Sequence, residues 1–167
     1  EENLQIVKLV KTVNLDQNML AVFLKAYAKG DIVLPDAYKA ELEKKGLTAT
    51  LYPFTDSNDL AQICTTAADK SDVIYVPTDN TVAENTGIVD NICEPKKIPV
   101  IAGEEGICSG CGIATLSISY YDLGANAAEM AYEILVNGSS PAEMPIAYVS
   151  EKIKKNYNAE LAEKLNI

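Results

Sequence analysis

The sequence predicts an α/β domain built on a mainly parallel sheet. Two observations support this fold class. Segments of strand character alternate along the chain with segments that have a helical period, which is the order of a parallel sheet with helices between its strands. The segment 20–24 is also apolar throughout, as expected for a central strand that is covered on both faces. With 167 residues, the chain can bury a substantial core without a metal or a disulfide.

The first elements follow from apolar spacing and from proline and glycine. Apolar residues at helical spacing between 4 and 13 predict an opening helix, and the run 20–24 predicts the first strand. Pro35 suits the first turn of a helix, because a proline lacks only an N–H that would be unpaired there. Gly46 ends this helix.

Two strands and two helices are expected in the middle of the chain. The segment 48–54 reads as a strand, and Asp56 and Ser57 are candidate caps for a helix that continues to Ala67. The segment 72–76 is the next strand, and one helix is expected over 82–92. The alternation of strand and helix therefore continues without a break.

The last part of the chain completes the pattern. Strands are expected at 98–102 and 113–118, and a long helix at 121–136. A short strand near 146–149 and a final helix at 159–165 close the fold.

Charge and composition exclude several classes of function. The net charge is −10, with acidic residues scattered along the chain, so binding of nucleic acid or of an anionic membrane surface is not expected. The chain contains no histidine, which removes Ser-His and Cys-His nucleophile pairs and histidine metal sites. We expect no enzyme activity, no metal and no cofactor.

We expect no signal peptide among the first residues of this sequence. Residues 1–4 have no basic segment followed by an apolar stretch, so they do not form a signal peptide. A helix is expected at once, without a leading strand. We therefore expect the chain to be a fragment of a longer protein.

The turn that follows the strand at 72–76 is the first candidate ligand site. Parallel sheets bind ligands at the carboxyl ends of their strands, and Thr78, Asp79 and Asn80 stand at such an end. Asp79 could bind a ligand cation such as an ammonium group, while Thr78 and Asn80 supply neutral hydrogen bonds. The alternative is that Asp79 or Asn80 only caps the next helix. Both roles are compatible.

The loop 103–106 is the second candidate site. Its two flanking glycines allow the backbone to approach a ligand closely, and Glu104 is the candidate contact. A solvated turn is the alternative, since two adjacent carboxylates on one loop rarely have the different environments that acid–base catalysis needs. We expect the turns 78–80 and 103–106 to lie side by side at one edge of the sheet.

Four cysteines leave several interpretations open. Cys108 and Cys111 form a C-x-x-C motif, but the residues after Cys111 read as a strand, whereas a thioredoxin-like pair needs its first cysteine at a helix start. A local disulfide between them is an alternative. Cys64 and Cys93 are expected on neighbouring helices as buried free thiols. A four-cysteine zinc site is disfavoured because these two stand 29 positions apart.

Several motifs in order resemble one family. The segments 72–82, 98–106 and 120–124, together with 55–60 and 162–165, are similar to the ABC-transporter substrate-binding proteins whose better-known members take up aromatic amino acids. The resemblance runs from about residue 2 to the end. It departs over residues 25–37, where family members usually present Ser and Asn to the carboxylate of the ligand. Here Lys29 could replace those donors, and the alternative is that this part of the site is altered or lost. Family members also tend to have an acidic residue where Ser119 stands.

The resemblance implies a type I periplasmic-binding-protein fold, in which two Rossmann-like lobes with helices on both faces of their sheets close on a small ligand. It implies that 1–112 form most of the second lobe, that 113–138 cross over to the first lobe, and that 139–167 return with the C-terminal helix. The expected function is an extracellular solute-binding protein, either a membrane-anchored lipoprotein or a periplasmic protein. It would bind an amino acid and deliver it to a membrane permease.

The sequence is also compatible with two other functions and with one mode of assembly. The same fold could serve as the extracellular sensing domain of a signalling protein, and Cys108 and Cys111 could make the chain a thiol–disulfide oxidoreductase. The helix at 121–136, without the sheet of a first lobe, could also pair with a second copy by swapping into a homodimer.

Overall fold

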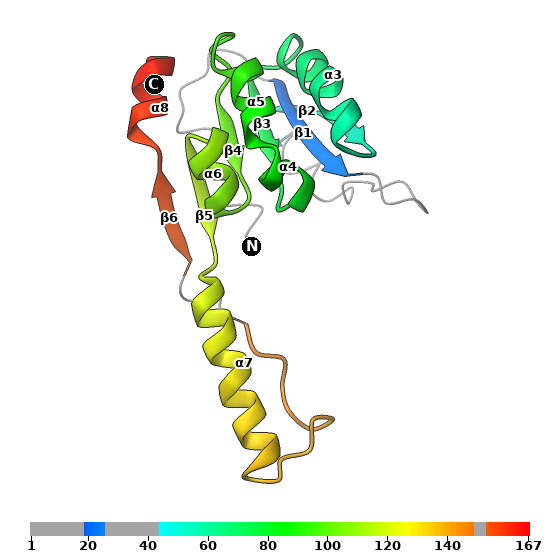
Figure 1. Ribbon diagram of the computed structural model, residues 1–167, viewed down its shortest axis with the longest axis vertical. Helices are drawn as coiled ribbons and strands as arrows, with labels where there is room; N and C mark the ends of the chain where they lie inside the picture. Colours follow the sequence, from blue (N-terminus) through cyan, green and yellow to red (C-terminus); the bar gives the residue numbers. More distant parts are fainter. Residues whose placement is uncertain (1–18, 26–43, 149–152) are drawn as a thin grey trace. The chain divides into compact units, whose positions relative to one another are not determined.

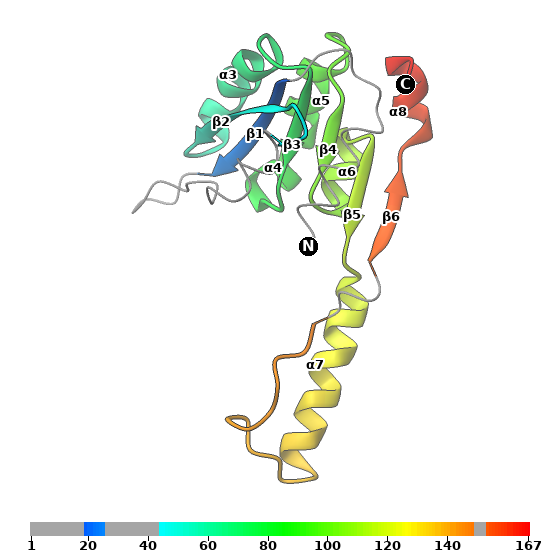
Figure 2. The same cartoon turned by 180° about the vertical axis from the view of Figure 1, so that it is seen from behind.

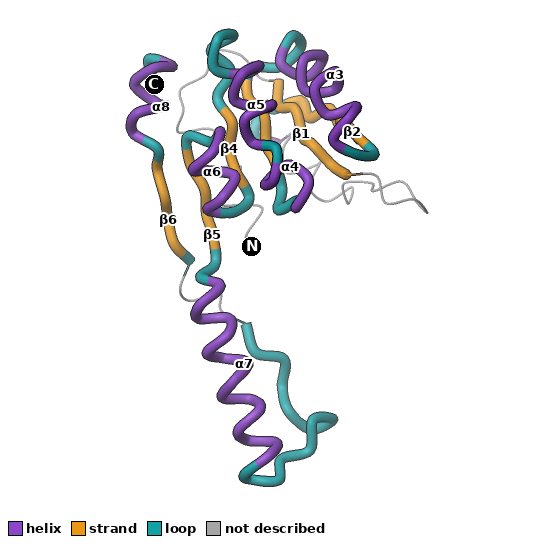
Figure 3. The backbone as a smooth tube through the Cα atoms, viewed as in Figure 1, coloured by secondary structure: helices purple, strands orange, loops and turns teal. Residues whose placement is uncertain are grey.

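The computed structural model describes residues 19–25, 44–148 and 153–167. These residues form strands and helices that alternate along the chain (Figure 1, Figure 3). The chain divides into two compact units, one made of 1–116 and 156–167 and the other of 117–155, and each is described by itself. The expected helix at 4–13 and the loop 26–31 with Lys29 lie outside the described residues, as does nearly all of the expected helix at 35–46.

The first unit is built on a sheet with the strand order β2-β1-β3-β4-β5-β6. The pairs β1–β2, β1–β3, β3–β4 and β4–β5 are all parallel, which confirms the predicted α/β class with a mainly parallel sheet. The strands are β1 (Met19–Lys25), β2 (Thr48–Phe54), β3 (Val73–Val76), β4 (Val100–Ala102), β5 (Ala114–Ser117) and β6 (Lys154–Tyr157).

Helices cover both faces of this sheet. One face carries α3 (Ser57–Ala68), α4 (Asn80–Glu84), α5 (Thr86–Cys93) and α6 (Glu105–Cys111), which lie together in front of the strands in Figure 1 and behind them in Figure 2. The other face packs against α8 (Ala159–Leu165), whose Leu161 and Leu165 are buried there.

The central strands explain why two separate cores form. Side chains of a strand alternate between its faces, so Ile74 and Val76 of β3 join the core under α3, α5 and α6, while Val73 joins the core under α8. In β4, Ile101 faces α8 and is fully buried. A strand that buries both faces needs apolar side chains on both, and Val73, Ile74 and Val76 provide them in β3.

Polar caps set the helix starts. Asp56 caps α3, since its carboxylate accepts from the backbone N–H of Asn58 at 2.7 Å, and Asp59 returns the contact by accepting from the backbone N–H of Asp56 at 3.2 Å. Asn158 caps α8 by accepting from the backbone N–H of Leu161 at 3.1 Å. The bounds predicted for these two helices are therefore close to those observed.

Three predicted elements need correction. The expected helix over 82–92 is two helices, α4 and α5, because the backbone leaves the helical conformation at Asn85. The second half of the loop 103–106 is helical, since α6 begins at Glu105 with Glu104 as its cap, which the sequence pattern does not reveal. The strand expected near 146–149 is wrong over its described residues 146–148, and the last strand is β6.

The second unit contains one long helix, α7 (Tyr120–Leu135), as predicted within one residue at each end. Ser119 caps it by accepting from the backbone N–H of Asp122 at 3.2 Å. None of its sixteen residues is buried. Tyr121 and Leu135 are 84% and 82% exposed, respectively, so α7 presents apolar side chains that nothing in its own unit covers.

Candidate functional site

The ends of β3 and β4 bring the two predicted turns together. The two strands are parallel and in register, with Val76 opposite Ala102, so the residues that follow them leave the sheet at the same edge. The backbone N–H of Gly103 donates to the carbonyl of Val76 at 2.7 Å, and the hydroxyl of Thr78 donates to the carbonyl of Gly103 at 3.3 Å. The turns 78–80 and 103–106 therefore lie side by side, as expected.

Gly103 makes this close approach sterically feasible. A Cβ atom at this position would lie 2.6 Å from the backbone nitrogen of Thr78 and 2.8 Å from the carbonyl carbon of Pro77. Real Cβ atoms essentially never approach backbone atoms so closely. The absence of a side chain at Gly103 thus allows the two turns to touch.

Asp79 caps α4 with one of its two carboxylate oxygens. Its Oδ1 accepts from the backbone N–H of Val82 at 3.0 Å. Among the described residues, none donates a hydrogen bond to the other oxygen, Oδ2. The side chain of Asp79 is half-buried, whereas Thr78 and Asn80 beside it are exposed. The cap and a ligand contact are therefore compatible, because Asp79 has an acceptor left over.

Glu104 uses both carboxylate oxygens to cap α6. Its Oε2 accepts from the backbone N–H of Gly106 at 2.9 Å, and its Oε1 accepts from that of Ile107. Glu104 holds the start of α6 in place beside the 78–80 turn, and it adds a second negative charge to the edge that carries Asp79.

Glu105 has a different environment from its neighbour. Its Oε1 accepts from the side-chain amide of Asn156 in β6 at 2.6 Å, across 51 positions of sequence. Glu104 and Glu105 therefore bond to different partners and do not form a carboxylate pair. Sequence reasoning missed Asn156, since no local signal connects two residues this far apart.

The C-x-x-C motif lies inside α6 and not at its start. Cys108 is the fourth residue of α6, and Cys111 is its last. Both thiols are buried. Burial raises the pKa of Cys108 to about 11 and that of Cys111 to about 12, and nearby carboxylates add to the effect. The two residues are free thiols, not a disulfide, and their high pKa values are opposite to those of a reactive redox pair.

In the described ranges, no group of three or more Cys, Asp or Glu side chains could hold a metal ion. No described helix is long and apolar enough to cross a membrane.

Comparison with known proteins gives a family match over almost the whole chain. Residues 4–167 match the profile of a family described as ABC transporter substrate binding protein. A tyrosine-binding protein of Clostridioides difficile (strain R20291) is 30% identical over 145 residues, which are 87% of this chain and 42% of that protein.

Two solved structures are similar in fold. An ABC domain in complex with L-Trp from Streptococcus pneumoniae has a TM-score of 0.85 at 26% identity, and covers 99% of this chain and 57% of its own. The ligand-free, open structure of a substrate-binding protein with adhesive properties from Clostridium difficile has a TM-score of 0.73 at 34% identity, with coverages of 96% and 54%. The chain thus spans about half the length of these relatives.

Proposed function

Because this chain belongs to the family of ABC transporter substrate-binding proteins, whose members bind ligands and are not enzymes, we propose that it forms one jaw of an extracellular solute-binding protein. The protein binds an amino acid between two lobes and delivers it to the permease of an ABC-type importer. The protein is extracellular, either as a membrane-anchored lipoprotein or as a periplasmic protein.

The observation that carries this proposal is the shared edge of β3 and β4. Thr78, Asp79 and Asn80 lie there beside Glu104, and the Oδ2 of Asp79, which accepts no hydrogen bond from any residue that the structure describes, has an exposed polar residue on either side in sequence. A carboxylate oxygen of this kind suits the ammonium group of an α-amino acid, and Thr78 and Asn80 suit neutral hydrogen bonds. Glu104 makes the same edge more attractive to a cation.

An aromatic amino acid is the ligand class that we propose. The support is the pair of relatives named for tyrosine and bound to L-Trp, each of which matches most of this chain. The carboxylate of such a ligand needs its own donor, and Lys29 remains the candidate from the sequence.

The second jaw is proposed to come from residues outside this chain. The exposed apolar residues of α7, among them Tyr121 and Leu135, support a crossover in which this helix packs on another lobe. On this proposal, 1–112 are most of the second lobe, 113–138 cross over and 139–167 return. If the first lobe is missing, a second copy could cover α7 in a swapped homodimer, which light scattering would detect as twice the monomer mass.

A ligand panel tests the proposed function. The protein with both lobes is heated with each amino acid in turn, and a ligand at about 100 times its Kd should stabilise it by about 2.7 kcal/mol. We expect the largest rise in Tm with an aromatic amino acid and little with the α-hydroxy acid that has the same side chain but lacks the ammonium. Equal melting temperatures across the panel would contradict the proposal.

A further inference from the structure

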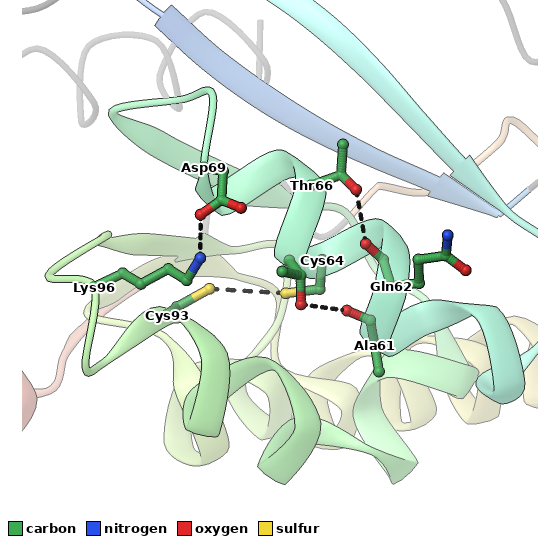
Figure 4. Close-up of polar contacts among 8 residues, drawn as sticks. Ala61, Gln62, Cys64, Thr66, Asp69, Cys93 and Lys96 are labelled. Carbon is green, nitrogen blue, oxygen red and sulfur yellow. Dashed lines mark hydrogen bonds and ion pairs between the residues drawn. The ribbon is translucent and has the colours of Figure 1, made fainter.

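Two thiols from distant parts of the sequence face each other in the core of the first unit. Cys64 of α3 and Cys93 of α5 have their sulfur atoms 3.8 Å apart and point toward one another (Figure 4). Both side chains are buried, with exposed fractions of 0% and 2%. They pack in the core that also holds Leu60, Val89 and Ile107.

From this geometry we infer that Cys64 and Cys93 are a site of oxidation, at which an intramolecular disulfide forms and joins α3 to α5. A disulfide needs its sulfurs about 2.05 Å apart. Each sulfur therefore has to move by less than about 1 Å to reach that length. The inference does not depend on the proposed transport function.

The local chemistry gives the two thiols different roles. The hydrogen bond from the thiol of Cys93 lowers the pKa of Cys64, because it stabilises the Cys64 thiolate. The positive charge of Lys96 acts in the same direction. The hydrogen bond with Cys64, followed by burial, raises the pKa of Cys93. Cys64 is thus the thiol that attacks an oxidant, and Cys93 is the thiol that resolves the product.

The reaction balances with a low-molecular-weight disulfide as the oxidant. The Cys64 thiolate attacks one sulfur of the oxidant, which gives a mixed disulfide and releases one thiolate. Cys93 loses its proton and attacks Cys64, which releases the second thiolate. The two cysteines are oxidised to one disulfide, the oxidant is reduced to two thiols, and the two protons pass from the cysteines to the leaving thiolates.

Burial determines when this reaction takes place. A thiol with no exposed surface is reached only when α3 and α5 separate locally or before they have packed. The ion pair between Lys96 and Asp69 lies beside the two sulfurs (Figure 4) and joins the segment after α5 to the C-terminal end of α3. Oxidation is therefore expected to be slow in the folded protein and faster in mild denaturant.

Cys108 and Cys111 provide the internal comparison. Their thiols interact with backbone carbonyls of their own helix region, Cys108 with Gly112 at 3.7 Å and Cys111 with Ile107 at 3.4 Å. No hydrogen bond joins these two sulfurs, whereas the thiols of Cys64 and Cys93 are hydrogen-bonded to each other, so the structure favours the long-range pair over the C-x-x-C pair.

The test uses the full reduced chain. It is incubated with oxidised glutathione in mild denaturant, returned to buffer, and mapped by mass spectrometry after the remaining thiols are alkylated. We expect one cross-linked peptide pair that contains Cys64 and Cys93, with Cys108 and Cys111 alkylated. Tm should rise by about 5 to 10 °C on oxidation and fall again with a reductant. A rise of this size is expected for a disulfide that closes a loop between residues 29 positions apart.

Matched double variants make the result specific. The chain with Cys108→Ala and Cys111→Ala should lose both remaining thiols and keep the rise in Tm, whereas the chain with Cys64→Ala and Cys93→Ala should lose neither thiol and show no rise. If either variant fails to fold, the peptide map of the unsubstituted chain decides. A cross-link between Cys108 and Cys111, or four thiols that still alkylate after full equilibration, would overturn the inference.

Discussion

Replacing Gly103 by alanine tests the contact on which the candidate site is built. The added Cβ would lie 2.6 Å from the Thr78 nitrogen and 2.8 Å from the Pro77 carbonyl carbon. Because both are backbone atoms, no side chain can rotate away, and one of the two strand ends has to shift. Such overpacking costs about 1 to 3 kcal/mol.

The shift also weakens two hydrogen bonds. Gly103 donates to Val76 and accepts from Thr78, and each bond contributes about 1 kcal/mol net. The free energy of unfolding should therefore fall by about 2 to 4 kcal/mol. This is a large part of the about 5 to 15 kcal/mol that separates the folded from the unfolded state of a typical protein. The variant should fold with a lower Tm and a displaced 78–80 turn.

The assay is denaturant unfolding of the variant beside Gly87→Ala. Gly87 lies in α5 with no atom within 4 Å of the added Cβ, so this substitution should be neutral or stabilise by up to about 1 kcal/mol. Both changes reduce the freedom of the unfolded chain equally, so their difference reports the steric contact. If the two variants are equally stable, the inferred close contact of Gly103 with Pro77 and Thr78 is contradicted.

Two further predictions concern the start of α3. Asp56→Ala should lower the free energy of unfolding by about 1 kcal/mol, since the cap on the Asn58 N–H is lost, while Asp56→Asn should cost much less; urea unfolding of both measures this. Backbone N–H bonds, first that of Thr55, hold the pKa of Asp59 below its ordinary value of 3.8. The contribution of Asp59 to stability is thus present at neutral pH and lost as the pH falls through its folded pKa. Asp59→Asn should flatten the acid side of a Tm-against-pH curve, and an unchanged curve would contradict this.

The parts of the fold that the sequence predicts are those with strong local signals. A fully apolar run such as 20–24 is typical of a central strand, and β1 lies between β2 and β3 in the sheet. Asp56 and Ser57 indicate by their side-chain chemistry where α3 begins. The same holds for Asp79, whose place after a strand predicts both its cap and its position at the edge of the sheet.

The missed elements have weak local signals and depend on distant partners. The strand Lys154–Tyr157 is polar and largely exposed. Its contacts with β5 hold it at the edge of the sheet, and the backbone N–H of Asn158 donates to the carbonyl of Ile113 at 2.8 Å. The cap of α6 is Glu104, and glutamate is not a favoured capping residue. The helix also contains two glycines. In both cases tertiary contacts decide against local preference.

The most direct test of the central claim is calorimetric titration of Asp79→Asn with an aromatic amino acid, on the protein that has both lobes. Asparagine caps helices about as well as aspartate, so the Oδ1 contact with Val82 and the Tm without ligand should be preserved. Removal of the charge should raise Kd roughly 10- to 100-fold, which corresponds to the free energy that a charge-assisted hydrogen bond contributes to binding. An unchanged Kd would show that the edge formed by the 78–80 and 103–106 turns does not hold the ammonium of the ligand.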